Sequence, residues 1–420
     1  MTRSNNNNAK IMLIICSILG CAAVAAQEVA RNETVGNRAR PELDALGIRI
    51  GGFRLFPELG AEARKNSNIF ATDADAISDT IYVGVPALAL RSDWNRHALN
   101  FGADGEILRY QDFTTEDHEN YSVFGQARID TVRGRFFLLD VFHRRRHEDR
   151  GSPDDERGFT PTPFDQDRAA LSFETPTGPR LFHTRLMVEY EQLDYEDVIG
   201  SGGVVNNDDR DRSSVFGSAR LGYGFHPAYS IFLQGSAHET EYDFQFDDRG
   251  FERSSTGYEV AVGTTLDFSG ATFGDIFVGY LSETYDDPRF DTIDGLSFGA
   301  DLSWNATGLT TITISGRRQV EATTVGETAG RDVVRFGLGI DHELLRNLIF
   351  ELRGSTATED FDGIDREDRV RSASFTARYM MNRWIELEIG YRYTDRDVDP
   401  PIAGIGFSRN IYSLSVKGQL

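Results

Sequence analysis

Few residues of this 420-residue chain are arranged as catalysis or metal binding would require. His143 and His147 end the run HRRRH, and on a strand they would lie about 13 Å apart at roughly 3.3 Å per residue, too far to share one metal ion. The acidic run NNDDRD (206–211) could hold a cation in a loop, but an ordinary acidic surface explains it better. No nucleophile motif stands out, and the sequence GRR (316–318) lacks the strand–loop–helix setting of a phosphate site. We therefore expect no enzyme activity, no metal site and no cofactor.

The recurring chemical feature is instead an arginine or carboxylate at alternate positions between apolar residues, which puts the charges on one face of a strand. If that face lines a pore, opposed arginines and carboxylates would set a transverse field across it. The alternative is that these are solvated residues that satisfy one another, since exposed ion pairs are common and weak. The residues predicted to line the pore are Arg128, Asp140, Arg144, Arg185, Glu189, Arg220, Asp301, Arg317, Arg335, Arg353, Arg378 and Arg392, and the same face is expected to carry Phe124, Phe142, Phe232 and Phe277.

The elements that must position these side chains are strands with one apolar and one polar face. In the segments 296–304, 384–393 and 412–420, every second residue is apolar or glycine and most of the intervening residues are polar. This period of two is typical of β-strands. Aromatic residues near the ends of such segments are expected to form interfacial girdles: Trp94, Tyr110, Tyr190, Tyr223, Tyr280, Trp304, Tyr379 and Tyr393.

The connections between these segments alternate between short and long. About eight short links, such as those at 92–96 and 305–308, take turns with about nine longer acidic stretches, such as 147–165 and 197–211. Neither a propeller nor a sandwich predicts this alternation, whereas a transmembrane barrel has short periplasmic turns and long surface loops. We predict an all-β fold: a transmembrane up-and-down antiparallel β-barrel of about 18 strands, with 16 as the alternative.

The first 26 residues are predicted to be a secretory signal peptide. Arg3 and Lys10 precede a short apolar stretch, and small residues near Ala25 offer a cleavage site. The alternatives are a retained helical anchor and a lipoprotein signal modified at Cys21. Both cysteines of the chain fall in this segment, so the mature protein is expected to have no disulfide.

The charge balance excludes one class of function. The chain has 66 acidic and 44 basic residues, a net charge of −22, and removal of Arg3 and Lys10 leaves −24. A protein that binds nucleic acid normally presents a basic face, so we expect no nucleic-acid partner.

The segment 39–70 resembles the opening of the putative β-barrel porin 2 family. The likeness rests on Pro41, Asp44, Gly47, Ile48, Arg49, Gly52, Phe53, Leu55, Phe56 and Pro57, followed by the Asn-Ile-Phe motif of Asn68, Ile69 and Phe70. The resemblance implies an outer-membrane barrel in a Gram-negative bacterium. It also implies, more loosely, a link to exopolysaccharide export, because several family members accompany such genes.

The two ends of the mature chain carry further expectations. Residues 27–50 are interpreted as a periplasmic segment that could plug the barrel, which would occupy residues 51–420. The terminal residues Tyr412, Leu414, Val416 and Leu420 resemble the signal read by the outer-membrane barrel assembly machinery, although leucine replaces the usual final aromatic residue.

Two classes of function remain after this reasoning. The first is an outer-membrane channel that passes exopolysaccharide or small solutes. The second is a non-conducting structural or adhesive barrel that acts through its long acidic loops. The expected partners are outer-membrane lipids, lipopolysaccharide, the assembly machinery and, for an exporter, polysaccharide export components.

Overall fold

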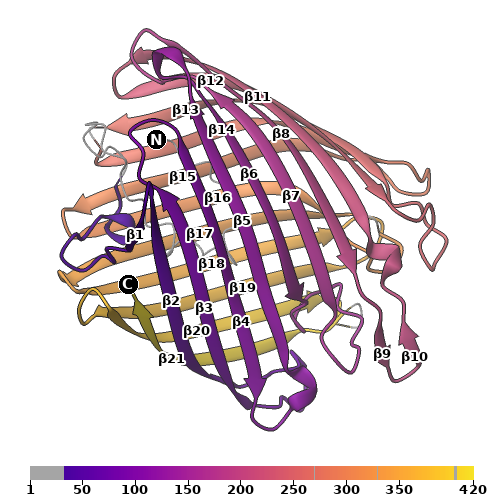
Figure 1. Cartoon of the computed structure of the whole chain (residues 1–420). Coiled ribbons are helices and arrows are strands. Elements are labelled where there is room, and N and C mark those ends of the chain that lie inside the picture. The colour runs from indigo at the N-terminus through magenta and orange to yellow at the C-terminus, as the bar shows by residue number, and fades with distance from the viewer. Residues whose placement is uncertain (1–32, 269, 329, 402–403) are drawn as a thin grey trace.

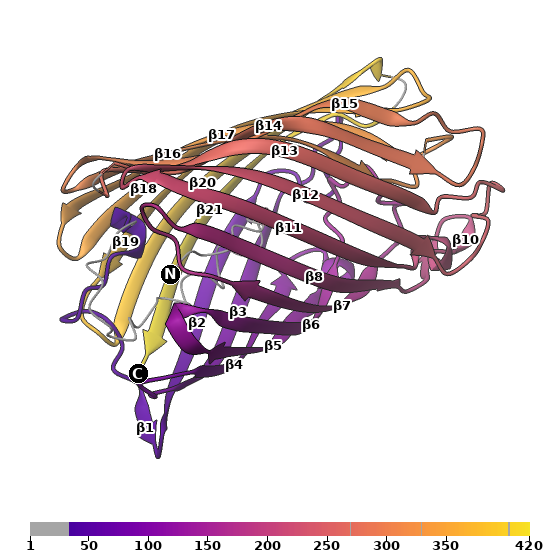
Figure 2. The same ribbon diagram turned by 90° about the horizontal axis from the view of Figure 1, so that it is seen from above.

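The strands of this protein close into a single barrel (Figures 1 and 2). The computed structural model describes residues 33–268, 270–328, 330–401 and 404–420. The wall consists of β2 (Phe53–Asn66), β3 (Asp79–Ser92), β4 (Ala98–Tyr110), β5 (His118–Asp130), β6 (Phe136–His147), β7 (Pro163–Glu174), β8 (Phe182–Tyr195), β11 (Arg212–His226), β12 (Tyr229–Tyr242), β13 (Ser255–Phe268), β14 (Thr272–Tyr285), β15 (Ile293–Thr307), β16 (Thr310–Ala322), β17 (Gly330–Leu345), β18 (Leu348–Phe361), β19 (Glu367–Met380), β20 (Ile385–Asp399) and β21 (Phe407–Gln419).

Each wall strand pairs antiparallel with the next one along the chain, and the ring closes where β2 pairs with β21, from Glu58 opposite Gln419 to Asn66 opposite Ile411. Two small additions lie outside the ring. The three-residue strand β1 (Ile48–Ile50) pairs with the start of β2, and β9 (Val198–Gly200) pairs with β10 (Gly203–Val205) in a hairpin between β8 and β11. The described part of the chain thus has eighteen wall strands, which confirms the predicted fold class and count and excludes the alternative of sixteen.

The predicted alternation of links is also confirmed. Eight links of two to seven residues lie at one end of the barrel, and nine links of five to sixteen residues lie at the other. Within the described ranges, the helices are the 3₁₀ turns η1 (Val35–Asn37), η2 (Thr114–Glu116), η3 (Val132–Gly134) and η4 (Asp208–Arg210), and none is long and apolar enough to cross a membrane.

The two faces of the wall differ as the alternation requires. Large apolar side chains point away from the barrel and stay open to the surroundings; Leu296, Ile389 and Leu414 are each about 60% exposed. Because water would make such a surface costly, the exposed apolar belt needs lipid around it.

The phenylalanines predicted on the inner face lie there, and glycines on neighbouring strands make room for them. The ring of Phe277 lies over Gly299, where an added Cβ would come within 2.2 Å of the ring, and Phe124 covers Gly102 in the same way. These rings therefore fill notches in the wall rather than project freely into the lumen.

One of the predicted girdle residues is placed wrongly. Tyr110 lies opposite Ile81 in the ladder and packs against the inner-face cluster of Ile81, Val83 and Leu108. Its position at a strand end suggested an interfacial role, but the register puts its side chain inside the barrel.

The outward orientation of the apolar side chains on the last strand, β21, can be tested. Leu414→Arg places a charge on the lipid face near the middle of β21, which is expected to cost about 2–4 kcal/mol of unfolding free energy in a lipid bilayer. The matched control is Ser415→Arg, which faces inward beside Glu62 and Glu388 in the register and is expected to cost little. Urea unfolding in phospholipid vesicles, followed by heat-modifiable gel migration, measures both. Equal losses in the two variants would contradict the assigned faces.

Candidate functional site

The candidate site is the charged lumen together with loop 148–162, which lies at the end of the barrel that carries the long links. All twelve side chains predicted to line a pore occupy inner-face positions of the register: Arg128, Asp140, Arg144, Arg185, Glu189, Arg220, Asp301, Arg317, Arg335, Arg353, Arg378 and Arg392. They come from ten different strands, so they surround the lumen rather than converge on one point. Their role in conduction stays a prediction.

Most of these charges are compensated by a neighbour on the wall. Arg185 pairs with Glu174 at 2.9 Å, and Arg220 pairs with Asp275 at 2.6 Å. The other pairs are Arg128 with Asp130, Glu189 with Arg168, Arg335 with Glu321, Arg353 with Asp341 and Arg378 with Glu351, while Asp140 accepts a hydrogen bond from Gln126. For these residues the alternative of mutually satisfied lumen groups describes the structure well.

Three of the arginines predicted to line the pore differ from the others in their ion pairing. Across the described ranges, Arg144, Arg317 and Arg392 form no ion pair with a carboxylate. Arg317 also stands directly opposite Arg335 in the ladder between β16 and β17, and like charges in that position are destabilising. Within the described ranges, these three guanidinium groups therefore lie on the inner face without a carboxylate in direct ion-pair contact.

The loop between β6 and β7, residues 148–162, extends over the mouth of the barrel. On one side Asp149 pairs with Arg409 of β21 at 3.1 Å, and on another Asp154 accepts hydrogen bonds from the hydroxyl of Thr323 and the backbone N–H of Thr324. In the order of wall strands β6 is the fifth and β16, which ends just before Thr323, is the thirteenth of eighteen, so the two stand nearly opposite. The loop consequently narrows the mouth.

A buried ion pair anchors this loop. Arg150 donates two hydrogen bonds to Glu116 of η2, at 3.0 and 2.6 Å, and the two residues are only 6% and 1% exposed. Burial alone would lower the pKa of Arg150, but the hydrogen bonds and the charge of Glu116 outweigh it and hold that pKa above its ordinary value. A second anchor is the pair of Glu148 with Arg210, at 2.7 Å.

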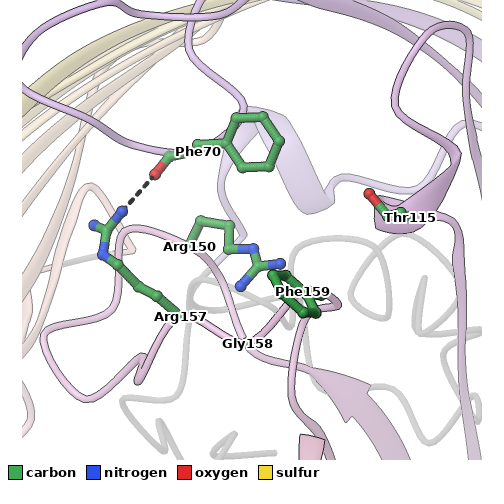
Figure 3. A pocket seen from close by; sticks show the side chains of 6 residues that line it. All are labelled: Phe70, Thr115, Arg150, Arg157, Gly158 and Phe159. Carbon is green, nitrogen blue, oxygen red and sulfur yellow. Dashed lines mark hydrogen bonds between the residues drawn. The ribbon is translucent and has the colours of Figure 1, made fainter. Parts of the chain in front are cut away.

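A pocket of about 550 Å³ lies where this loop meets the links after β2 and β4. It is lined by Phe70, Thr115, Arg150, Arg157, Gly158 and Phe159 (Figure 3). The guanidinium of Arg157 donates hydrogen bonds to the backbone carbonyls of Phe70, at 3.2 Å, and Ala71, at 3.4 Å. The pocket is thus assembled from three links that are far apart in the sequence.

Two residues with a strained backbone lie beside this pocket. Ala71 has a φ of +49° and Arg157 a φ of +56°, the left-handed region that favours glycine. Each such residue costs on the order of 1–3 kcal/mol and persists only where the surroundings hold it, often at a functional site. Here the two strained residues are joined by the hydrogen bond from Arg157 to the carbonyl of Ala71.

The Asn-Ile-Phe motif after β2 supports one side of the pocket. The buried amide of Asn68 donates hydrogen bonds to the carbonyls of Thr72 and Ser408 and accepts one from the N–H of Thr72. This fixes the turn that presents Phe70 and its carbonyl to Arg157. The sequence pointed to the motif, but it gave no signal for Glu116, Arg150, Arg157 or Phe159, because their partners lie in other loops.

The opposite end of the barrel holds the N-terminal segment. Val35 is fully buried against Ile349 and Met380, and Arg40 forms a buried ion pair with Glu343 at 2.9 Å. Burial lowers the pKa of Arg40 despite that pair. Residues 33–44 therefore lie against the inner face of β16 to β19 at the short-turn end. The predicted signal peptide, residues 1–26, lies outside the described residues, as do residues 27–32.

Metal ligands do not gather in the part of the chain that the structure describes: no group of three or more His, Cys, Asp or Glu could hold an ion. His143 forms a hydrogen bond with Asp167, and His147 lies with its ring 4.6 Å from that of His118. The two histidines of HRRRH thus have separate partners.

Comparison with known proteins gives one family match. Residues 40–420 match the family described as putative beta-barrel porin 2. No curated protein matches the chain.

Several solved structures share the barrel shape at low similarity. OpdQ of Pseudomonas aeruginosa is 14% identical with a TM-score of 0.47, and the match covers 88% of this chain and 99% of that one. OpdO of Pseudomonas aeruginosa is 16% identical with a TM-score of 0.45, covering 88% and 98%. The siderophore receptor PirA of Acinetobacter baumannii is 9% identical with a TM-score of 0.44, covering 87% and 80%. Similarities this low carry no information about the function of the present chain.

The anchor at Glu116 can be tested by proteolysis. Glu116→Ala leaves the buried Arg150 without its bidentate partner, and breaking a buried pair in this way typically costs about 3–5 kcal/mol. We expect trypsin to cleave within residues 148–162 at least about tenfold faster than in the wild type. The matched control is Glu119→Ala, which removes an exposed partner of Arg109 on the outside of the wall. Unchanged cleavage in Glu116→Ala would show that the pair does not order the loop.

Proposed function

Because this chain belongs to the putative β-barrel porin 2 family, which it matches over residues 40–420, we propose that it forms a diffusion channel for small polar solutes across the outer membrane. The observation that carries the proposal is the closed barrel whose inner face bears charged side chains from ten strands while its outer face is apolar. A wall of eighteen strands encloses space that side chains alone do not fill.

Loop 148–162 favours small solutes over polymers. It is held at Arg409 on one side and at Thr323 on the other, and hence divides the mouth. A long exopolysaccharide would need a wide and continuous path, whereas a small solute can pass beside the loop. We therefore rank export of exopolysaccharide, and with it an association with polysaccharide export components, below solute diffusion.

A non-conducting structural or adhesive barrel is the second candidate. The observation that favours it is that both ends of the barrel are partly occupied, by loop 148–162 at one end and by residues 33–44 at the other. In that case the N-terminal segment would be a plug, and the long loops would be the active surface.

The route to the membrane belongs to the same proposal. A signal peptide over residues 1–26 would direct export, and Tyr412, Leu414, Val416 and Leu420 would be read by the barrel assembly machinery. Three of these four side chains are about half exposed or more on the outer face, and Val416 is 45% exposed, which makes all of them accessible to a partner. Lipopolysaccharide and other outer-membrane lipids would then surround the apolar belt.

Single-channel conductance tests the channel directly. Replacement of residues 151–158 by Gly-Gly-Ser is expected to raise the conductance of refolded protein in a planar bilayer, because it removes the part of the loop that crosses the mouth. Replacement of Ser201 and Gly202, the two residues at the tip of the β9–β10 hairpin, by Asn-Gly serves as the control; it leaves Ile199, whose carbonyl accepts a hydrogen bond from the backbone N–H of Phe159, in place and is expected to leave conductance unchanged. If neither the wild type nor the loop variant conducts while the barrel is folded, the non-conducting alternative is correct.

A plugging role for the N-terminal segment has its own test. Arg40→Ala leaves Glu343 without its shortest ion pair, so residues 33–44 are expected to exchange deuterium faster and the conductance to rise. Arg49→Ala, at an exposed arginine of β1, is the control. Faster exchange without any change in conductance would show that the segment is attached to the wall but does not obstruct the channel.

A further inference from the structure

The pocket formed by Phe70, Thr115, Arg150, Arg157, Gly158 and Phe159 is not explained by solute diffusion alone. We propose that it binds a small organic anion with a flat apolar ring, of the aromatic carboxylate class, and delivers it to the lumen. The delivery rests on the proposed channel function, whereas the binding does not.

The charge of the pocket supports an anion. Among the described residues Arg157 forms no ion pair with a carboxylate, and its guanidinium donates hydrogen bonds to two neutral backbone carbonyls. Three carboxylates of the same loop contact other groups: Glu148 contacts Arg210, Asp149 contacts Arg409 and Asp154 contacts Thr323. The other two are Asp155, which lies 3.6 Å from Arg150 and accepts a hydrogen bond from the backbone N–H of Arg157, and Glu156; among the described residues neither forms an ion pair with the Arg157 guanidinium.

Arg150, the second arginine of the pocket, has a different role in the proposed binding. Arg150 is bound bidentately by Glu116 and is buried, so its charge is already compensated. It forms a flat polar wall, and a guanidinium plane of this kind stacks well on an aromatic ring. Arg157 is therefore the group that would recognise the carboxylate, since its hydrogen bonds to carbonyls leave further N–H groups free.

The aromatic walls support a ring-bearing ligand. Phe159 is 58% exposed although it lies against the pocket, and Phe70 presents its ring from the other side in Figure 3. Phe70 is also held edge-on by Phe113, at 5.4 Å between ring centroids, which fixes its orientation. Two phenylalanine rings and a guanidinium plane provide apolar and stacking contacts that a simple inorganic anion would not use.

The conformation of the pocket indicates that it is preformed. The strained residues Ala71 and Arg157 are joined by a hydrogen bond from the Arg157 guanidinium to the Ala71 carbonyl, and Asn68 fixes the turn that carries Phe70. Placing the guanidinium before the ligand arrives lowers the entropy that binding must overcome.

Isothermal titration of the folded, detergent-solubilised full-length mature protein with benzoate tests the binding. We expect benzoate to bind, acetate and benzyl alcohol to bind much more weakly, and Arg157→Gln to weaken benzoate at least about tenfold, the effect of losing one charge-assisted contact. Phe159→Ala is expected to weaken benzoate and benzyl alcohol alike. Arg133→Gln is the matched control: this arginine is also exposed and also has a positive φ, +60°, but lies in a turn at the other end of the barrel.

The outcomes separate this inference from the channel itself. Three results would overturn the assignment of the pocket, whatever the conductance. They are no binding of benzoate to the wild type, equal affinity of the wild type and Arg157→Gln for benzoate, and equal affinity of the wild type for acetate and benzoate. Benzoate that binds and also blocks the single-channel current, with both effects lost together in Arg157→Gln, supports binding and delivery. If benzoate binds specifically to a folded barrel that never conducts, the binding site is supported and the channel function is excluded.

Discussion

The constraint on which this structure depends is that hydrocarbon offers no partner to an open backbone N–H or C=O group. A sheet can satisfy it only by closing, and here closure requires β2 and β21, more than 340 residues apart in the sequence, to pair along nine positions. The pairing fixes the register of the ring, and the register fixes which side chains face lipid and which face the lumen. The charged inner wall is thus a consequence of closure, since the polar half of each strand has nowhere else to point.

The same closure explains why the loops carry the specificity. The inner face carries small apolar clusters such as Ile81, Val83 and Leu108, together with ion pairs such as Arg185 with Glu174 and phenylalanines set over glycines, such as Phe277 over Gly299. These contacts stabilise the wall, but they leave a passage that does not distinguish one small solute from another. The distinct geometry arises where loop 148–162 meets the links after β2 and β4, because there a strained backbone, two phenylalanine rings and the Arg157 guanidinium come together.

The fold could be predicted from the sequence because its signal is local. Alternation within segments such as 412–420 and the alternation of short and long links need no knowledge of distant contacts, and both followed from the chain alone. The faces of Arg317 and Arg392 followed for the same reason. The pocket could not be predicted, because Arg157 finds its acceptors at Phe70 and Ala71, 87 and 86 residues earlier in the chain. Tyr110 was misplaced because an aromatic residue at a strand end gives no indication of face without the register.

Arginine has a particular task in such a molecule. Three of the 44 basic residues are lysines, and both cysteines lie in the first 26 residues, so the loops are held without disulfides and largely without ammonium groups. Arg253 shows how this works: it pairs with Asp247 of its own loop and donates to the carbonyls of Thr323, Gly326 and Thr328 in a neighbouring one. A planar guanidinium with five donors can join several acceptors in this fixed way, which an ammonium group cannot. Such charged contacts therefore contribute much of the order of the mouth loops, whereas the wall beneath them is held by backbone hydrogen bonds between strands.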